Sequence, residues 1–187
     1  MEEKIARFKA DLNLGTTHLV QKYITAAESE ILTSCDHFSL KDAISGQFGV
    51  HPNEIILVGS AKVGFSLAPD KRYREFGDSS DLDVAIISPV LFDRVWHSVL
   101  DYKNSRQYWP KKNEFKHHFF DGWIRPDKLP PSKKFSFANE WWEYFTELSN
   151  SQRFGMQSIN AGLYREMSFL DKYQSLCIEK CKQAESF

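Results

Sequence analysis

The sequence predicts an α+β (α/β) protein, in which a small mixed β-sheet is flanked by helices and the chain has N-terminal and C-terminal helical extensions. Two short apolar segments, 54–58 and 81–87, have the β-branched composition of buried strands and are bounded by turn residues. Helical periodicity dominates the chain before and after them. Helices, then strands joined by a turn, then more helices are typical of such a plan.

The bulk composition favours one folded, globular domain. The chain has 187 residues, of which 42% are hydrophobic and 26% are charged. Its formal net charge of −1 gives no global field that would attract nucleic acid or a membrane surface. We divide this single domain into N-terminal helices over 1–50, a sheet core over 54–125 and C-terminal helices over 138–187.

The cysteines and the apolar segments favour a cytoplasmic protein. Cys35, Cys177 and Cys181 are an odd and sparse set, which suits a reducing compartment better than a disulfide framework. The first residues are charged and amphipathic, and no apolar run approaches the length of a membrane span. We therefore expect no disulfides and no association with a membrane.

Periodicity and turn signals place the elements along the first half of the chain. Gly15 separates two helical patterns, and Ser39 with Asp42 resembles a capping box at the start of a third helix that ends near Gly49. The expected order is helix 3–13, helix 16–34, helix 39–49, strand 54–58, helical turns over 61–67, loop 68–80 and strand 81–87.

The second half is rich in aromatic residues and is mostly helical. Apolar residues recur at helical spacing in three segments, and the segment between the first two is rich in Lys, Pro and aromatics. The expected order is helix 91–102, an irregular stretch over 104–137 with a strand inside 115–124, helix 138–148 and helix 163–183.

Asp81 and Asp83 form the first half of a candidate site. Residues two apart in a strand point to the same face, about 6–7 Å from each other along the chain. Two carboxylates so close repel each other and raise each other's pKa unless a cation lies between them. A hard divalent ion such as Mg²⁺, or Mn²⁺ in its place, prefers oxygen ligands, and the phosphate oxygens of a nucleotide would complete its coordination shell.

Gly59 and Ser60 form the second half. A glycine at the end of a strand lets the backbone approach a ligand closely, and a helix that begins after Ser60 would direct N–H groups at a phosphate. Four basic residues near in sequence are candidates to neutralise phosphate charge, although a solvated surface loop would explain some of them equally well. They are Lys62, Lys71, Arg72 and Arg74.

The pattern of an apolar strand, Gly59-Ser60, a connection and Asp81-x-Asp83 in a second apolar strand resembles the DNA polymerase β-like nucleotidyltransferase superfamily, especially its minimal bacterial members. The resemblance covers residues 54–90. It implies that Gly59 and Ser60 bind the triphosphate, that Asp81 and Asp83 bind metal, and that an NTP donates NMP to a hydroxyl on a protein or RNA. It also suggests a bacterial toxin–antitoxin or phage-defence setting.

Two features depart from that family. The connection between the motifs is longer than in minimal members, and its extra residues, about Pro69 to Gly77, would form a basic loop near the phosphates. The family also has a third carboxylate, on a later strand, that activates the attacking hydroxyl. Asp121 is the best candidate here, and Glu114 and Asp127 are weaker ones.

Two other functions stay open at this point. Without a third carboxylate, two-metal chemistry is impaired, and the protein would be a nucleotide-binding regulator or an antitoxin-like partner. Alternatively, residues 106–134 combine an excess of Lys and Arg with interleaved aromatics, which is typical of an RNA-binding module, although a basic loop over an aromatic core has the same composition.

Overall fold

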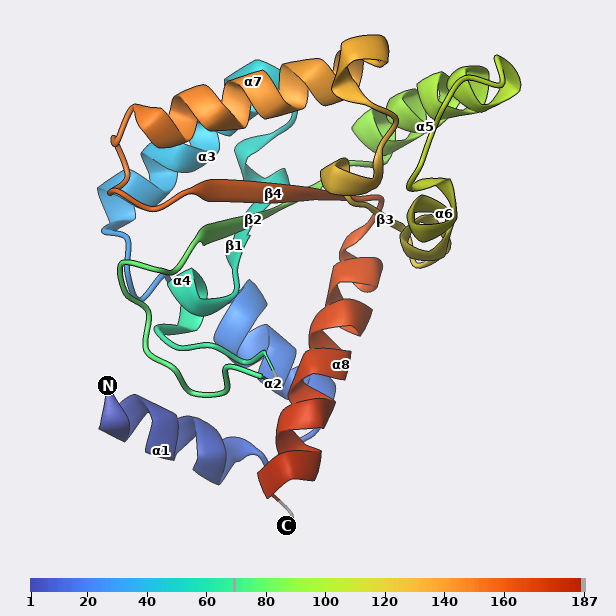
Figure 1. The fold of residues 1–187 in the computed structure, drawn as a ribbon. Coiled ribbons are helices and arrows are strands. Elements are labelled where there is room, and N and C mark those ends of the chain that lie inside the picture. Colours follow the sequence, from blue (N-terminus) through green and yellow to red (C-terminus); the bar gives the residue numbers. More distant parts are fainter. Residues whose placement is uncertain (69, 186–187) are drawn as a thin grey trace.

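The computed structural model describes residues 1–68 and 70–185. These residues form a four-stranded mixed sheet with helices on both of its faces, which confirms the predicted fold class (Figure 1). Pro69, where the expected basic loop begins, lies outside the described residues. Within the described residues, no helix combines the length and the apolar character needed to cross a membrane.

The strand order in the sheet is β1-β2-β4-β3. β1 (Ile55–Val58) and β2 (Leu82–Ile87) are antiparallel, β2 and β4 (Ile159–Tyr164) are parallel, and the two-residue β3 (Trp123–Ile124) is antiparallel to β4. The first two strands agree with the predicted ones to within one residue. The crossover from β2 to β4 brings a strand from far along the chain against the candidate site.

One face of the sheet carries the larger core. In Figure 1, α3 (Ser34–Phe48) and α7 (Ser136–Asn150) lie above the sheet, and α5 (Pro89–Asn104) contributes to the same core. Leu82, Val84 and Ile86 of β2 all face this core, as their alternation with Asp83 and Ala85 predicts. Pro89 at the first helical position and the Ser88 side chain begin α5 two residues earlier than expected.

The other face is covered less completely. The first turns of α8 (Met167–Glu185) pack against this face, where Leu170 lies with Ala85, Ile87 and Tyr164, and the helix then runs away from the sheet (Figure 1). Farther from the sheet, α1 (Glu2–Asp11) and α2 (Thr16–Val20) pack against the end of α8 around the buried Phe8. This arrangement leaves the first part of β2 and of β4 without a helix directly over it.

The predicted helix 16–34 is wrong beyond its first turns. α2 passes into a π-helical turn (Gln21–Thr25), and the next helix begins only at Ser34, because Thr33 caps it by accepting from the backbone N–H of Asp36. The predicted cap Ser39 lies inside α3. The intervening residues bond elsewhere: Ser29 Oγ accepts from Leu32 N–H and donates to the Ala61 carbonyl.

Segment 27–30 is hydrogen-bonded to α4 (Ser60–Val63), the short helix after β1. The buried Lys62 ammonium donates to the carbonyl of Ala27, and the Glu30 N–H donates to the carbonyl of Lys62. The bond from Ser29 to Ala61 is the third link. An irregular segment that periodicity assigns to a helix thus supports the turn after β1.

The second half of the chain differs from expectation at two places. Residues 112–120 form helix α6 (Lys112–Phe120), and the strand expected within 115–124 is reduced to its last two residues. The expected helix 163–183 begins only at Met167, because residues 159–164 form β4. Short 3-10 turns lie at Pro52–Glu54, Pro126–Lys128 and Ser132–Lys134.

Candidate functional site

A cleft of about 620 Å³ lies on the α8 face of the sheet, and its lining also includes Trp141, Trp142 and Phe145 of α7, from the opposite face. Its floor is made of residues that alternate with the core-facing ones: Asp83 and Ala85 on β2, and Asn160, Gly162 and Tyr164 on β4. One wall is α4 and the loop after it, and the other is α8 with Tyr173, Gln174 and Cys177. Gly59, Ser60 and Asp81 line the same cleft.

Gly59 lies against the carboxylate of Asp83. Antiparallel pairing sets Val58 opposite Asp83, so the turn that follows β1 passes directly over that side chain. A Cβ atom on Gly59 would lie 2.9 Å from Asp83 Oδ2. Gly59 also has φ 66° and ψ −154°, a conformation that residues with side chains rarely adopt. Both the space and the backbone conformation therefore require glycine at this corner.

Asp81 and Asp83 contribute two acidic groups to the cleft. Asp81 directly precedes β2 and is exposed, whereas Asp83 is partly buried within the strand. Burial, and secondarily the charge of Asp81, raise the pKa of Asp83 to about 6. A bound divalent cation would offset both the cost of burying the Asp83 charge and its repulsion by Asp81, so these two carboxylates fit the donor set that Mg²⁺ prefers.

Two of the four candidate phosphate-binding cations line the cleft. Lys71 and Arg74 lie in the loop between α4 and β2 and are exposed there. The other two do not line the cleft. Lys62 is only 3% exposed and donates to the Ala27 carbonyl behind α4, while Arg72 donates to the Lys180 carbonyl on α8 at 3.2 Å. Lys62 and Arg72 thus have structural partners, and sequence proximity alone could not separate them from Lys71 and Arg74.

The position beside Asp83 on the neighbouring strand is occupied by Asn160. Parallel pairing makes Asp83 and Asn160 register partners, and the Asn160 side chain is exposed at the cleft. Sequence reasoning missed Asn160 because it assigned no strand to residues 159–164. An amide oxygen is a weaker metal ligand than a carboxylate, and an amide is no base at neutral pH.

The three carboxylates proposed from sequence lie elsewhere or are already paired. Asp121 ends helix α6 instead of lying on a strand, and neither it nor Glu114 lines the cleft. Glu114 forms an ion pair with Lys128. Asp127 does line the cleft, but it is 3.0 Å from the Arg125 guanidinium and also pairs with Lys128. Among residues 1–68 and 70–185, no cluster of three or more His, Cys, Asp or Glu side chains could hold a metal.

Aromatic side chains form the end of the cleft at β3. Trp123 stacks on Tyr164 with centroids 5.3 Å apart, and the Arg125 guanidinium lies 5.3 Å from the Trp123 ring. Trp123 can lie this close to the sheet because Gly162 has no side chain; a Cβ there would be 2.5 Å from Trp123 Nε1. The ring of Trp142, on α7, lines the cleft with 41% of the residue exposed.

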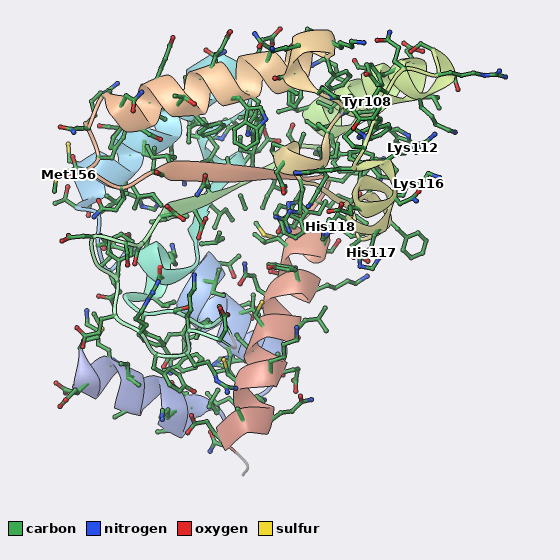
Figure 2. All side chains as sticks on the ribbon, in the orientation of Figure 1. Tyr108, Lys112, Lys116, His117, His118 and Met156 are labelled. Atoms are coloured by element: carbon green, nitrogen blue, oxygen red, sulfur yellow. The ribbon has the colours of Figure 1, made fainter. Side chains whose placement is uncertain are left out.

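The basic residues of segment 106–134 mostly lie outside the cleft. Lys112, Lys116, His117 and His118 belong to α6, on the side of the molecule beyond β3 (Figure 2). None of them lines the cleft. Burial, followed by the charge of Arg125, lowers the pKa of His118, so this imidazole is neutral at physiological pH. Of segment 106–134, Arg125 is the one cation among the described cleft-lining residues.

Comparisons of this chain with protein-family models, with curated proteins and with solved structures find no match. We therefore infer the function from the geometry of the cleft.

Proposed function

We propose that this protein binds a nucleoside triphosphate together with Mg²⁺ and transfers the NMP group to a hydroxyl acceptor. One observation carries the proposal: the glycine corner after β1 lies against the Asp83 carboxylate, within a cleft that also contains Asp81, Ser60, Lys71 and Arg74. Groups that bind phosphate and groups that bind a divalent cation therefore face the same space. The resemblance of segment 54–90 to the polymerase β-like nucleotidyltransferases is consistent with this use.

Each group has a distinct role in this proposal. Gly59 allows the backbone to approach the triphosphate, and the Ser60 hydroxyl donates a hydrogen bond to it. Lys71 and Arg74 balance its negative charge. Asp81 and Asp83 hold Mg²⁺, which when bound stabilises the charge that develops on the phosphoryl oxygens. The residues position the reactants and stabilise charge, which is the main contribution that proteins make to phosphoryl transfer.

Label transfer tests the proposal. The protein is incubated with α-labelled NTPs, Mg²⁺ and candidate hydroxyl acceptors, and both pyrophosphate release and label on the acceptor are measured. The proposal expects Mg²⁺-dependent transfer that is abolished in an Asp81→Ala/Asp83→Ala variant. Asp101→Ala, which removes an exposed carboxylate from α5, is the matched control and leaves transfer unchanged. Transfer that persists in the double variant contradicts the proposal.

Asn160 favours a second candidate function, nucleotide binding without turnover. The cleft has no unpaired third carboxylate within the described residues, and the residue beside Asp83 cannot accept the acceptor's proton. In this case the protein is a regulator that senses an NTP. The same experiment separates the two functions, because the regulator binds labelled NTP with Mg²⁺ but releases no pyrophosphate.

A further inference from the structure

The outer edge of β4 is open beside the candidate site. β3 pairs only with Leu163 and Tyr164, whereas β2 pairs with all of β4. The first part of β4, from Ile159 to Gly162, therefore has a neighbouring strand on one side alone within the described part of the chain. The same residues line the cleft. Figure 1 shows β4 in front of β2 and β1, with no element drawn across this part of the strand.

Hydrogen bonds at the two ends of β4 determine which backbone groups face the open edge. The carbonyls of Ser158 and Tyr164 accept from Leu82 and Ser88, so even-numbered residues direct their backbone groups at β2. Odd-numbered residues direct theirs outward: Ile159 N–H donates to Ser149 Oγ at 2.9 Å, and Arg165 N–H donates to the Gly122 carbonyl at 3.1 Å.

Ala161 lies between these outward-facing residues. Its N–H and its C=O both point to the open edge, and no described residue forms a hydrogen bond with either group. An unpaired donor and acceptor on one strand residue match the backbone of another extended chain, which is the chemistry of strand addition. The edge is short, so it would hold only a short stretch of an extended segment.

The chemistry of the proposed reaction brings the acceptor to this side. In phosphoryl transfer the attacking and the leaving oxygens lie roughly in line through phosphorus. In the proposed reaction pyrophosphate leaves toward Gly59 and Ser60, which lie on the β1 side of the Asp pair. The acceptor hydroxyl therefore approaches from the opposite side, which is the side of β4.

We propose that the acceptor is an extended polypeptide segment that pairs with Ala161 along the open edge of β4. This proposal rests on the function proposed above. The peptide residue opposite Ala161 faces α7, and the residues next to it face the cleft floor with Asp83 and Asn160. A strand beside β4 lies two strand spacings, about 10 Å, from β2, so a Ser, Thr or Tyr side chain reaches toward the α-phosphate.

The proposed transfer is an in-line displacement at the α-phosphorus. The hydroxyl oxygen of the peptide residue forms a bond to this phosphorus, and the bond from phosphorus to the bridging oxygen of pyrophosphate breaks. The electron pair of that bond leaves with pyrophosphate, and the hydroxyl proton passes to water. The products are a nucleotidylated peptide and pyrophosphate, with no redox change.

The charge at the open edge favours polypeptide over RNA as the acceptor. RNA binding depends on unpaired cations along the path of the backbone. Among the described residues that line the cleft on this side, the cation is Arg125, and it is already paired with Asp127. The unpaired basic residues Lys112 and Lys116 lie on α6, outside the cleft (Figure 2).

Peptide labelling with matched variants tests the proposal. An array of short synthetic peptides, each with a central Ser, Thr or Tyr, is incubated with the protein, Mg²⁺ and α-labelled NTPs; a short RNA with a free 3′ hydroxyl is tested in parallel. Ala161→Pro removes the outward backbone N–H without removing a bond to β2. Ala161→Ser keeps that backbone N–H and changes the side chain only by a hydroxyl group. Peptides N-methylated at the residues flanking the acceptor remove the matching donors from the substrate.

The expected result is labelling of a subset of peptides by the wild type and by Ala161→Ser. Ala161→Pro and N-methylation each reduce the labelling by about tenfold or more, while Ala161→Pro still binds NTP. Label on RNA alone, an N-methylated peptide labelled as well as its parent, or no peptide labelled by a protein that binds NTP would each overturn the proposal. A wild type that binds no NTP with Mg²⁺ instead rejects the function on which the proposal rests.

Discussion

Asp83 and Asn160 are register partners on the parallel strands β2 and β4, and both side chains face the same cleft. An acidic residue therefore lies beside an amide at the centre of the sheet, in the place where a further carboxylate would complete a metal site. Under the proposed function, the residue at position 160 would distinguish an enzyme from a nucleotide sensor, and one substitution can change it.

Asn160→Asp is expected to strengthen Mg²⁺ binding. A third carboxylate beside Asp83 adds a charged oxygen ligand, so the affinity for Mg²⁺ rises by about tenfold and nucleotidyl transfer rises with it. Without Mg²⁺ the variant is less stable than the wild type above pH 6, because like charges repel. Thermal unfolding over a Mg²⁺ titration measures the stability of the metal-free protein and its affinity for Mg²⁺. Asn104→Asp, at the exposed end of α5, serves as control, and equal Mg²⁺ responses in the two variants contradict the prediction.

Asp83→Asn is expected to stabilise the protein at neutral pH. The folded-state pKa of Asp83 is raised to about 6 from an ordinary value of 3.8, chiefly by burial. The penalty for the charged form is absent below pH 3.8 and grows as pH rises through 6, so wild-type stability falls over that interval. The variant avoids this penalty and gains about 1–3 kcal/mol at pH 7.5, with no gain near pH 3.5.

Mg²⁺ adds a second readout to the same variant. We expect Mg²⁺ to stabilise the wild-type protein at pH 7.5, because the cation would bind the folded state, and we expect Asp83→Asn to show little response. Denaturant unfolding at both pH values, with and without Mg²⁺, measures these changes. The prediction fails if the substitution lowers stability at pH 7.5 in the absence of metal.

Gly59→Ala is expected to lower stability by about 1–3 kcal/mol and to abolish NTP binding, because the new methyl group meets Asp83 Oδ2 and the backbone has a positive φ. Gly46→Ala is the matched control. Gly46 lies in α3 with nothing within 4 Å of an added Cβ, so its substitution stabilises the helix by about 0.5–1 kcal/mol. Thermal melting and a filter-binding assay with labelled NTP distinguish the two; similar melting shifts in both variants argue against strain at Gly59.

Arg74→Ala is expected to weaken NTP binding by about five- to tenfold, since Arg74 lines the cleft and a guanidinium can bond phosphate. Arg72→Ala removes a bond to the Lys180 carbonyl outside the cleft and leaves the affinity unchanged. Calorimetric titration with NTP and Mg²⁺ at low salt measures both affinities. Equal losses for the two substitutions would mean that the loop acts only through its overall charge.

The strands on both sides of the glycine corner were predictable because each is a short β-branched run bounded by turn residues. β4 was not, because Asn160, Ala161 and Gly162 all have low strand propensity. That strand forms because tertiary contacts override propensity: Ile159 and Leu163 are buried in the core, and Gly162 makes room for Trp123. Asn160 could not be recognised as a site residue without this strand.

Other parts of the candidate site show the same limit. The choice of Asp121 as third carboxylate assumed that it lies on a strand. Residues 112–120 instead form the helix α6, and Asp121 lies at its C-terminal end. Lysine is a residue type that commonly binds phosphate, but the Lys62 ammonium donates to the carbonyl of Ala27, which lies 35 residues earlier. No local sequence pattern reveals such a contact. Motif spacing identified the corner and the Asp pair, whereas long-range packing determined which neighbours accompany them.

The three bonds between segment 27–30 and α4 make the N-terminal region part of the glycine corner's support. A shortened protein that begins at Ser34 would keep every residue of the cleft in its sequence but would lose the acceptor of the Lys62 ammonium and the other two bonds that hold α4. A fusion protein that contains residues 34–185 would therefore keep the structure of the cleft only if it also contains residues 27–33.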